Sequence, residues 1–173
     1  MSYFFKNPKD KIKSKALLIF IGLFIVAFAI RFPFFFRDYI DKDESTFILM
    51  GQAWADGNLP YLALWDLKPP VTFAYFGLMI TVFGKSLWWI RMGGVLMVST
   101  TSFMVYIFLR NNNKPFNQSI VLAVLSLYFS SLFGSVQGVM SEHISMIFYL
   151  GGLLVWSYTH KNAFPKEWML WGI

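Results

Sequence analysis

Residues 38–70 read DYIDKDESTFILMGQAWADGNLPYLALWDLKPP, and this stretch decides how the rest of the chain is interpreted. It is the only long segment whose composition does not suit a lipid bilayer. It holds six of the nine acidic residues of the chain, namely Asp38, Asp41, Asp43, Glu44, Asp56 and Asp66. It ends on a lysine followed by two prolines. If this chain catalyses a reaction, we expect the carboxylates of this stretch to take part.

The composition indicates an integral membrane protein. Of the 173 residues, 57% are hydrophobic and only 14% are charged, whereas a soluble domain has roughly 25% charged residues. The net charge of +6 would suggest nucleic acid in a soluble protein. Here the basic residues flank apolar runs, so we expect them to set topology and to contact lipid headgroups, with no nucleic-acid partner. The chain has no cysteine, which excludes disulfides, a thiol nucleophile and thiolate metal ligands.

Four apolar runs predict an all-α membrane protein with about four transmembrane helices, at residues 16–36, 87–109, 119–133 and 144–158. Basic residues beside a span tend to stay in the cytoplasm. We therefore expect the tail 1–15, the loop 110–118 and the segment 159–173 inside the cell. The segment 159–173 also resembles the start of a further span. The loop 37–86 and the turn 134–143 are then extracytoplasmic.

Two features of this topology have alternatives. The basic tail, the apolar run and the Ala27-Phe28-Ala29 site are also typical of a cleaved signal peptide, although the aromatic run that follows favours a retained span ending at a membrane interface. Residues 71–83 are apolar but would form a helix of only ~20 Å, against a hydrocarbon core of ~30 Å. We interpret them as an interfacial or re-entrant helix. Arg31 is expected to reach the outer headgroups.

Within the extracytoplasmic loop, residues 44–56 predict a short amphipathic helix lying at the membrane interface. Its apolar stripe has helical spacing and comprises Phe47, Met50 or Gly51, and Trp54. Asp43 stands where an N-terminal cap is expected, and Gly57 stands where a C-terminal cap is expected. We therefore expect any active site to lie in the extracytoplasmic loop 37–86, which contains the interfacial helices.

An ordered set of short motifs carries a resemblance to a known family. It consists of Arg31 and Pro33, the acidic pair Asp43-Glu44, the turn Gly57-Asn58-Leu59-Pro60-Tyr61, the sequence Trp65-Asp66-Leu67-Lys68-Pro69-Pro70, Phe83-Gly84, and Arg91. In this order and spacing, the chain resembles the N-terminal part of the dolichyl-phosphate-mannose-protein mannosyltransferases. The resemblance extends from about residue 31 to residue 91 and continues weakly to Glu142.

The resemblance implies a multi-span, C-type glycosyltransferase. Such an enzyme transfers a sugar, with inversion, from a polyprenyl-phosphate glycoside donor to a hydroxyl of a lipid, glycan or protein acceptor on the extracytoplasmic side. By resemblance Asp43 is the catalytic base, with Glu44 in support, and a carboxylate at a helix start suits that role. Lys68 and Arg91 are the candidate donor-phosphate ligands, because a cation stabilises a departing phosphate.

The remaining acids are candidates for support or for metal binding. In several relatives the acidic residues hold a divalent metal, so the resemblance suggests Mg, Mn or Ca at Asp43, Asp66 and Glu142, whose oxygen ligands suit these ions. The chain departs from some members of the family at Leu67, where they have an acid directly before Lys-Pro-Pro.

A non-enzymatic alternative follows from length. Complete relatives have several hundred residues and many more spans, so the 173-residue chain is expected to be a fragment. If it is not, an assembly subunit or an inactive remnant of such an enzyme would account for it. The presence of the acidic pair together with Lys-Pro-Pro favours the transferase.

Overall fold

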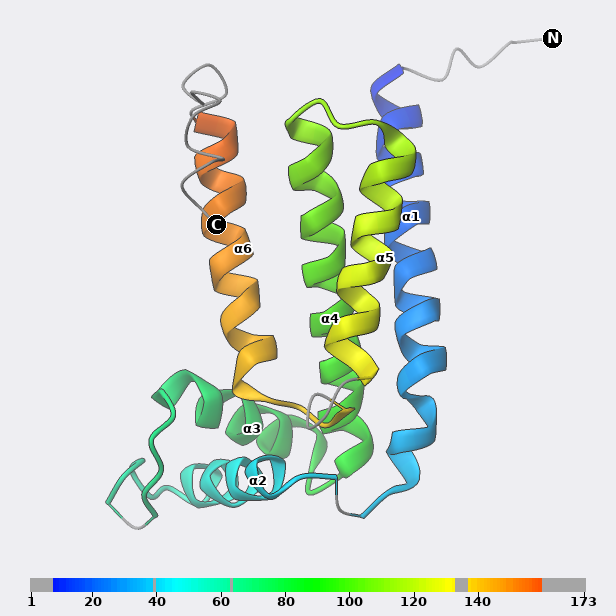
Figure 1. Ribbon diagram of the computed structural model, residues 1–173. Helices are drawn as coiled ribbons and strands as arrows, with labels where there is room; N and C mark the ends of the chain where they lie inside the picture. The colour runs from blue at the N-terminus through cyan, green and yellow to red at the C-terminus, as the bar shows by residue number, and fades with distance from the viewer. Residues whose placement is uncertain (1–7, 39, 63, 133–136, 160–173) are drawn as a thin grey trace, which may run out of the picture.

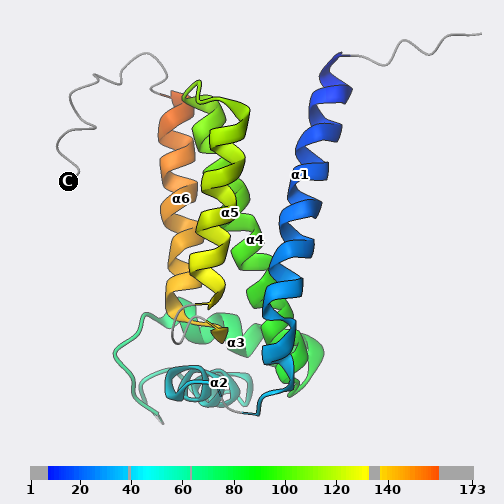
Figure 2. The same cartoon turned by 45° about the vertical axis from the view of Figure 1, so that its right-hand side comes forward.

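The computed structural model describes residues 8–38, 40–62, 64–132 and 137–159, and within these ranges every regular element is helical. Four long helices stand side by side: α1 (Pro8–Arg31), α4 (Leu87–Asn111), α5 (Phe116–Leu132) and α6 (Ser141–Thr159). Two shorter helices, α2 (Lys42–Ala55) and α3 (Pro70–Phe83), lie across one end of this bundle (Figures 1 and 2). A short 3-10 helix, η1 (Phe32–Phe36), connects α1 to that layer.

Two of the long helices are long and apolar enough to cross a membrane. They are the stretches Lys15–Phe36 and Leu87–Asn111, which correspond to the first and second predicted spans. Helices α3 and α5 are apolar but shorter. The class of helical membrane protein is therefore supported by two candidate spans.

The layer formed by α2 and α3 consists of two short helices, and residues at their ends fix where each one begins and stops. Asp41 caps α2, since its side chain accepts a hydrogen bond from the Asp43 amide at 2.8 Å. At the other end, Gly57 has φ +90° and its amide bonds the Trp54 carbonyl, an arrangement that glycine adopts without strain. Helix α3 begins at Pro70, whose fixed φ suits the first turn, and its C-terminal cap is Gly84, with φ +75°.

The prediction of Asp43 as the N-terminal cap is wrong, because the helix begins earlier than the acidic pair and Asp41 takes that position. The predicted C-terminal cap at Gly57 is consistent with the observed end of α2. The predicted apolar stripe is also observed. Phe47, Met50 and Gly51 are buried, and Trp54 is half-buried beside them.

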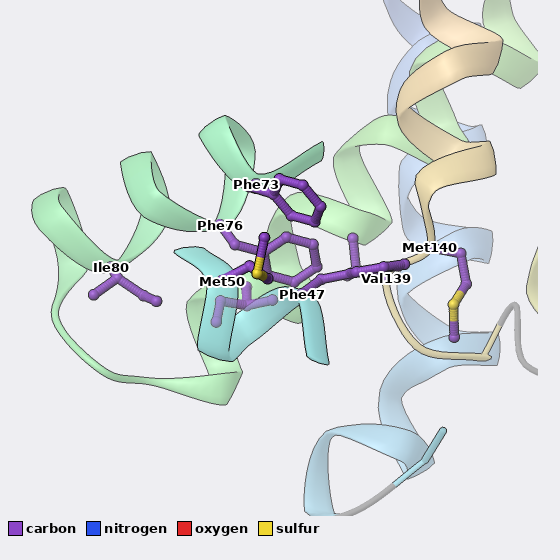
Figure 3. Packing of buried hydrophobic residues seen from close by; sticks show 8 residues of the cluster. Phe47, Met50, Phe73, Phe76, Ile80, Val139 and Met140 are labelled. Atoms are coloured by element: carbon purple, nitrogen blue, oxygen red, sulfur yellow. The ribbon is translucent and has the colours of Figure 1, made fainter. Parts of the chain in front are cut away.

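A compact apolar cluster joins α2, α3 and the segment before α6. Figure 3 shows Phe47 and Met50 of α2 packed with residues of α3 and with Val139, and Met140 belongs to the same cluster. The two helices approach closely at Gly51, where an added Cβ would lie 2.4 Å from the Phe76 Cβ atom. A larger residue there would force α2 and α3 apart. This cluster fixes the start of α2 against the start of α6.

A second apolar cluster holds the long helices together. It is formed by residues of α1, η1, α4 and α5, among them Leu23, Ala27, Val95, Val98 and Leu127. The two clusters meet at the end of the bundle where α2 and α3 lie. The charged residues described next are buried at this junction.

Candidate active site

A buried ion pair connects α2 to α4. Glu44 lies in the first turn of α2, and its Oε2 atom accepts a hydrogen bond from Nη2 of Arg91 at 3.1 Å. The two side chains are only 3% and 2% exposed, respectively. The other carboxylate oxygen, Oε1, accepts a hydrogen bond from the Val139 amide at 2.9 Å. Both oxygens of Glu44 are thus bonded, one to α4 and one to the segment before α6.

Arg91 also closes the turn that follows α1. Its Nη1 group donates to the carbonyl of Phe34 at 2.7 Å, to that of Phe35 at 3.5 Å, and to that of Arg37. Carbonyls at the end of a helix need such donors. Only Nε of this guanidinium lacks an acceptor among the described residues. Arg91 therefore holds three parts of the fold in register: η1, α2 and α4.

A second buried arginine holds the segment before α6 from the other side. Nη2 of Arg31 donates to the carbonyls of Gly138, at 2.7 Å, and Gln137, at 3.1 Å. Its Nη1 group donates to the Ser130 carbonyl at 3.1 Å. Arg31 is 1% exposed. The expectation that it reaches the headgroups is wrong, because three carbonyls inside the fold bind its guanidinium instead.

His143 bonds to the same carbonyl as Arg31. Its Nδ1 atom accepts a hydrogen bond from the Met140 amide at 3.0 Å, so Nε2 carries the proton and donates to the Ser130 carbonyl at 3.0 Å. Burial, followed by the nearby positive charge of Arg31, lowers the pKa of His143 to about 4. The imidazole is therefore neutral at physiological pH. Its two hydrogen bonds connect the segment before α6 to the last turns of α5.

Two glycines make room for this arrangement. A Cβ at Gly138 would lie 2.9 Å from Cδ of Glu44, and one at Gly94 would lie 2.7 Å from a methyl group of Val139. Real Cβ atoms do not approach other heavy atoms so closely. Gly138 and Gly94 therefore allow the segment 137–140 to pass directly over the Glu44 carboxylate.

Asp43, the predicted base, directly precedes this buried carboxylate. Its amide is bound by Asp41, while its side-chain carboxylate has no hydrogen bond or ion pair with any group that the structure describes. The side chain is partly exposed. The acidic pair thus has two different environments: Glu44 is buried and fully bonded, and Asp43 is accessible.

Lys68 and Glu142 form a second ion pair, which joins the segment before α3 to the first turn of α6. Nζ of Lys68 lies 3.4 Å from Oε1 of Glu142, and the two side chains are 33% and 63% exposed. The lysine backbone is fixed, since its amide bonds Asp66 at 2.9 Å and its carbonyl accepts from the Tyr61 hydroxyl at 2.7 Å. Asp66 is thereby a turn residue that positions Lys68.

The pKa of Glu142 reflects opposing effects. Partial burial is the largest and raises the pKa, but hydrogen bonds from its own backbone and Ser141, together with the charge of Lys68, outweigh it and lower the pKa overall. Glu142 is therefore ionised at neutral pH. It holds the ammonium group of Lys68 at the surface of the fold.

The predicted metal ligands were compared with the positions of the acidic and histidine side chains. Among the residues that the structure describes, no three His, Asp or Glu side chains come together as a metal site would require. Asp66 is engaged with the Lys68 backbone and Glu142 with its side chain. The carboxylates of Asp43, Asp66 and Glu142 are therefore not gathered into one ligand set in the described part of the chain.

Several of these contacts had no signal in the sequence. The Val139 amide is a backbone group 95 residues from Glu44, and the carbonyls that bind Arg31 and Arg91 are also backbone groups. The predicted phosphate ligand Arg91 is 1% exposed, so in this conformation a lipid phosphate has no access to it. Arg91 does carry a sequence signal, because it interrupts an apolar run and such a charge usually has a partner, but the polar neighbours of Glu44 do not single it out as that partner.

No protein-family model, no curated protein and no solved structure matches this chain. The geometry described above and the motifs in the sequence are therefore the basis for a functional proposal.

Proposed function

We propose that this chain is the donor-side part of a membrane glycosyltransferase that uses a polyprenyl-phosphate glycoside. The observation that carries the proposal is that the two adjacent acids, Asp43 and Glu44, have different environments. Glu44 is bonded to Arg91 and Val139 at 3.1 and 2.9 Å, which fixes the first turn of α2. Asp43 extends from that fixed turn with a carboxylate that has no described partner. A base that is held in place yet open to a substrate is what proton abstraction needs.

The proposed reaction is an inverting displacement. The oxygen of an acceptor hydroxyl attacks the anomeric carbon of the donor sugar, and the bond from that carbon to the phosphate oxygen breaks. The electron pair of the broken bond leaves with the polyprenyl phosphate, and the hydroxyl proton passes to the Asp43 carboxylate. Lys68 stabilises the negative charge of the departing phosphate. Its partner Glu142 holds the ammonium group at the start of α6, partly exposed to solvent, before the donor arrives.

We further propose that Arg91 acts as a positioning residue. Its guanidinium is buried and shared between Glu44 and the carbonyls of η1. It would then influence transfer through the orientation of α2 without touching the donor phosphate. This reassigns the role that the resemblance implies for it.

The membrane arrangement supports the same proposal. We propose four spans, formed by α1, α4, α5 and the apolar part of α6 after His143, with the α2–α3 layer on the extracytoplasmic side. The start of α1 and the connection from α4 to α5 lie at the end of the bundle that is remote from this layer (Figure 1). Lys15, Arg110 and Lys114 belong to these parts of the chain or to the turns beside them. Basic residues favour the cytoplasmic side. The acidic layer would then face the compartment where polyprenyl-linked sugars are used.

The experiment that tests the function replaces Asp43 by Asn in the full chain. We expect D43N to reduce sugar transfer from a polyprenyl-phosphate donor by about two to four orders of magnitude, the range for loss of a general base. Transfer is measured in isolated membranes with a radiolabelled donor. The matched control is D56N, which removes an exposed carboxylate at the other end of α2 and is expected to leave transfer unchanged.

Correct insertion of D43N is checked by its resistance to carbonate extraction. If D43N inserts and transfers sugar at the normal rate, the assignment of Asp43 as base is wrong. If the unaltered chain itself transfers no sugar, the result favours the alternative of a non-enzymatic assembly subunit or inactive remnant.

A further inference from the structure

A cavity lies at the end of the bundle remote from the α2–α3 layer. It has a volume of about 700 Å³ and is formed by α1, the last turns of α4 and the start of α5. This volume falls within the ~300–1,000 Å³ typical of ligand pockets. The cavity shares no lining residue with the candidate active site. Its ligand is therefore a separate question from the sugar donor.

The body of the cavity is apolar. Leu18 and Ile19 of α1 face Ile107 of α4, and Phe116 of α5 contributes an aromatic wall. Tyr106 adds a second aromatic side chain to this lining, which is mostly apolar. Such a lining suits a hydrocarbon chain, whose contacts are non-directional.

The rim of the cavity is cationic. Lys15 and Arg110 both line it and both are exposed. Nη1 of Arg110 donates to the Lys114 carbonyl at 2.7 Å, which holds the guanidinium in place. The Asn111 side chain also lines the cavity, and its buried Nδ2 group has no acceptor within the described part of the chain. Among the lining residues that the structure describes, none is acidic.

We propose that this cavity binds an anionic phospholipid. One acyl chain lies against Leu18, Ile19 and Ile107, and the phosphate group lies between Lys15 and Arg110. Lys15 stands where the apolar stretch of α1 begins, and Arg110 stands in the last turn of α4; these two stretches are long and apolar enough to span a bilayer. We therefore expect these two cations to lie at the level of the lipid headgroups. The bound lipid fills the gap between α1 and the rest of the bundle at this end.

The first test measures lipid retention by the full chain. The protein is released from nanodiscs that contain equal amounts of phosphatidylglycerol and phosphatidylcholine, and retained lipid is counted by native mass spectrometry. We expect the unaltered protein to retain phosphatidylglycerol in preference to phosphatidylcholine. R110Q is expected to reduce that preference about fivefold, and K15Q/R110Q further, because each basic group near an anionic surface contributes about that factor.

K114Q is the matched control for charge. Lys114 lies in the connection just after the α4 turn that holds Arg110, but it does not line the cavity, so its loss is expected to have a much smaller effect. If K114Q lowers retention as much as R110Q, the attraction is a general one between basic ends and anionic lipid, and the proposed site is wrong.

A second pair of variants tests the cavity without altering charge. A16W places a large ring in the cavity lining, and we expect it to abolish preferential retention. L17W adds the same ring one residue away, at a side chain that is 59% exposed and points out of the cavity, and should preserve it. Retention that survives A16W, or equal retention of both lipids by the unaltered protein, would overturn the proposal.

Discussion

Two ion pairs of the same chemistry stand at the α2–α3 end of this molecule, and they differ in almost every physical respect. Glu44 and Arg91 are nearly sealed from solvent, with side chains 3% and 2% exposed. Lys68 and Glu142 are 33% and 63% exposed. An isolated buried charge is costly, so each member of the first pair depends on the other. Exposed charges are solvated and screened, so the second pair can open at little cost.

The difference indicates that the buried pair stabilises the fold, whereas the exposed pair is accessible to a ligand. The buried pair is supported by further hydrogen bonds to backbone groups of η1 and of the segment before α6. It holds three elements together. The exposed pair positions a single ammonium group that a ligand can reach. The predictions below test this contrast in order of expected effect.

The largest effect is expected from E44Q. The change leaves the Arg91 charge buried without its counter-ion, which is expected to lower the free energy of unfolding by about 3–5 kcal/mol. Denaturant unfolding in detergent micelles, followed by tryptophan fluorescence, measures it. The matched variant E142Q makes the same chemical change in the exposed pair and should cost less than about 1 kcal/mol. Similar losses for the two variants would contradict the contrast between the pairs.

An intermediate effect is expected from G138A. The new methyl group would lie 2.9–3.1 Å from the Glu44 carboxylate, which cannot move aside because Arg91 and Val139 bind it. We expect a loss of about 1–3 kcal/mol in the same unfolding experiment, the usual cost of overpacking.

Two further variants sharpen the G138A prediction. G151A lies in the middle of α6, where an added Cβ meets nothing within 4 Å, and should be neutral or stabilising by up to ~1 kcal/mol. In an E44A background the obstructing carboxylate is absent, so the cost of G138A should fall. An unchanged cost in that background would show that Gly138 is needed for another reason.

The smallest effect on stability is expected from K68Q. Loss of an exposed pair should change the free energy of unfolding by less than about 1 kcal/mol. Under the proposed function the same change weakens the donor interaction, so KM for the polyprenyl-phosphate sugar should rise while the protein remains folded. K85Q, another exposed lysine outside the junction, serves as the control for donor KM. A loss of stability as large as that of E44Q would place Lys68 in the framework of the fold.

Much of the fold was predictable from local patterns. Runs of apolar residues anticipated the long helices, and the spacing of Phe47, Met50 and Trp54 anticipated the buried face of α2. The start of α2 was misplaced because Asp41 and Asp43 are both good capping residues and nothing local ranks them. The expectation for Arg31 failed for a different reason. A basic residue at the end of a span usually reaches water, and only the folded chain supplies the carbonyls that keep it inside.

The residues of the candidate site were named from the sequence, and the structure adds which of them are paired: Glu44 with Arg91, and Lys68 with Glu142. The sequence could not predict that, of the adjacent acids Asp43 and Glu44, Glu44 would be buried and Asp43 accessible. Asp43 and Glu44 are adjacent and chemically alike, and helix geometry points neighbouring side chains in different directions. Which direction faces the core depends on what packs there.

The amino-acid sequence alone determined the class of the protein, the positions of its apolar helices and the concentration of acid between the first two candidate spans. These properties depend on composition and on short-range periodicity. Tertiary structure determined that Glu44 pairs with Arg91, 47 residues away, and with the Val139 amide, 95 residues away. Burial of a charge is a property of the whole assembly, because the free energy of the charge depends on every group that replaces its water.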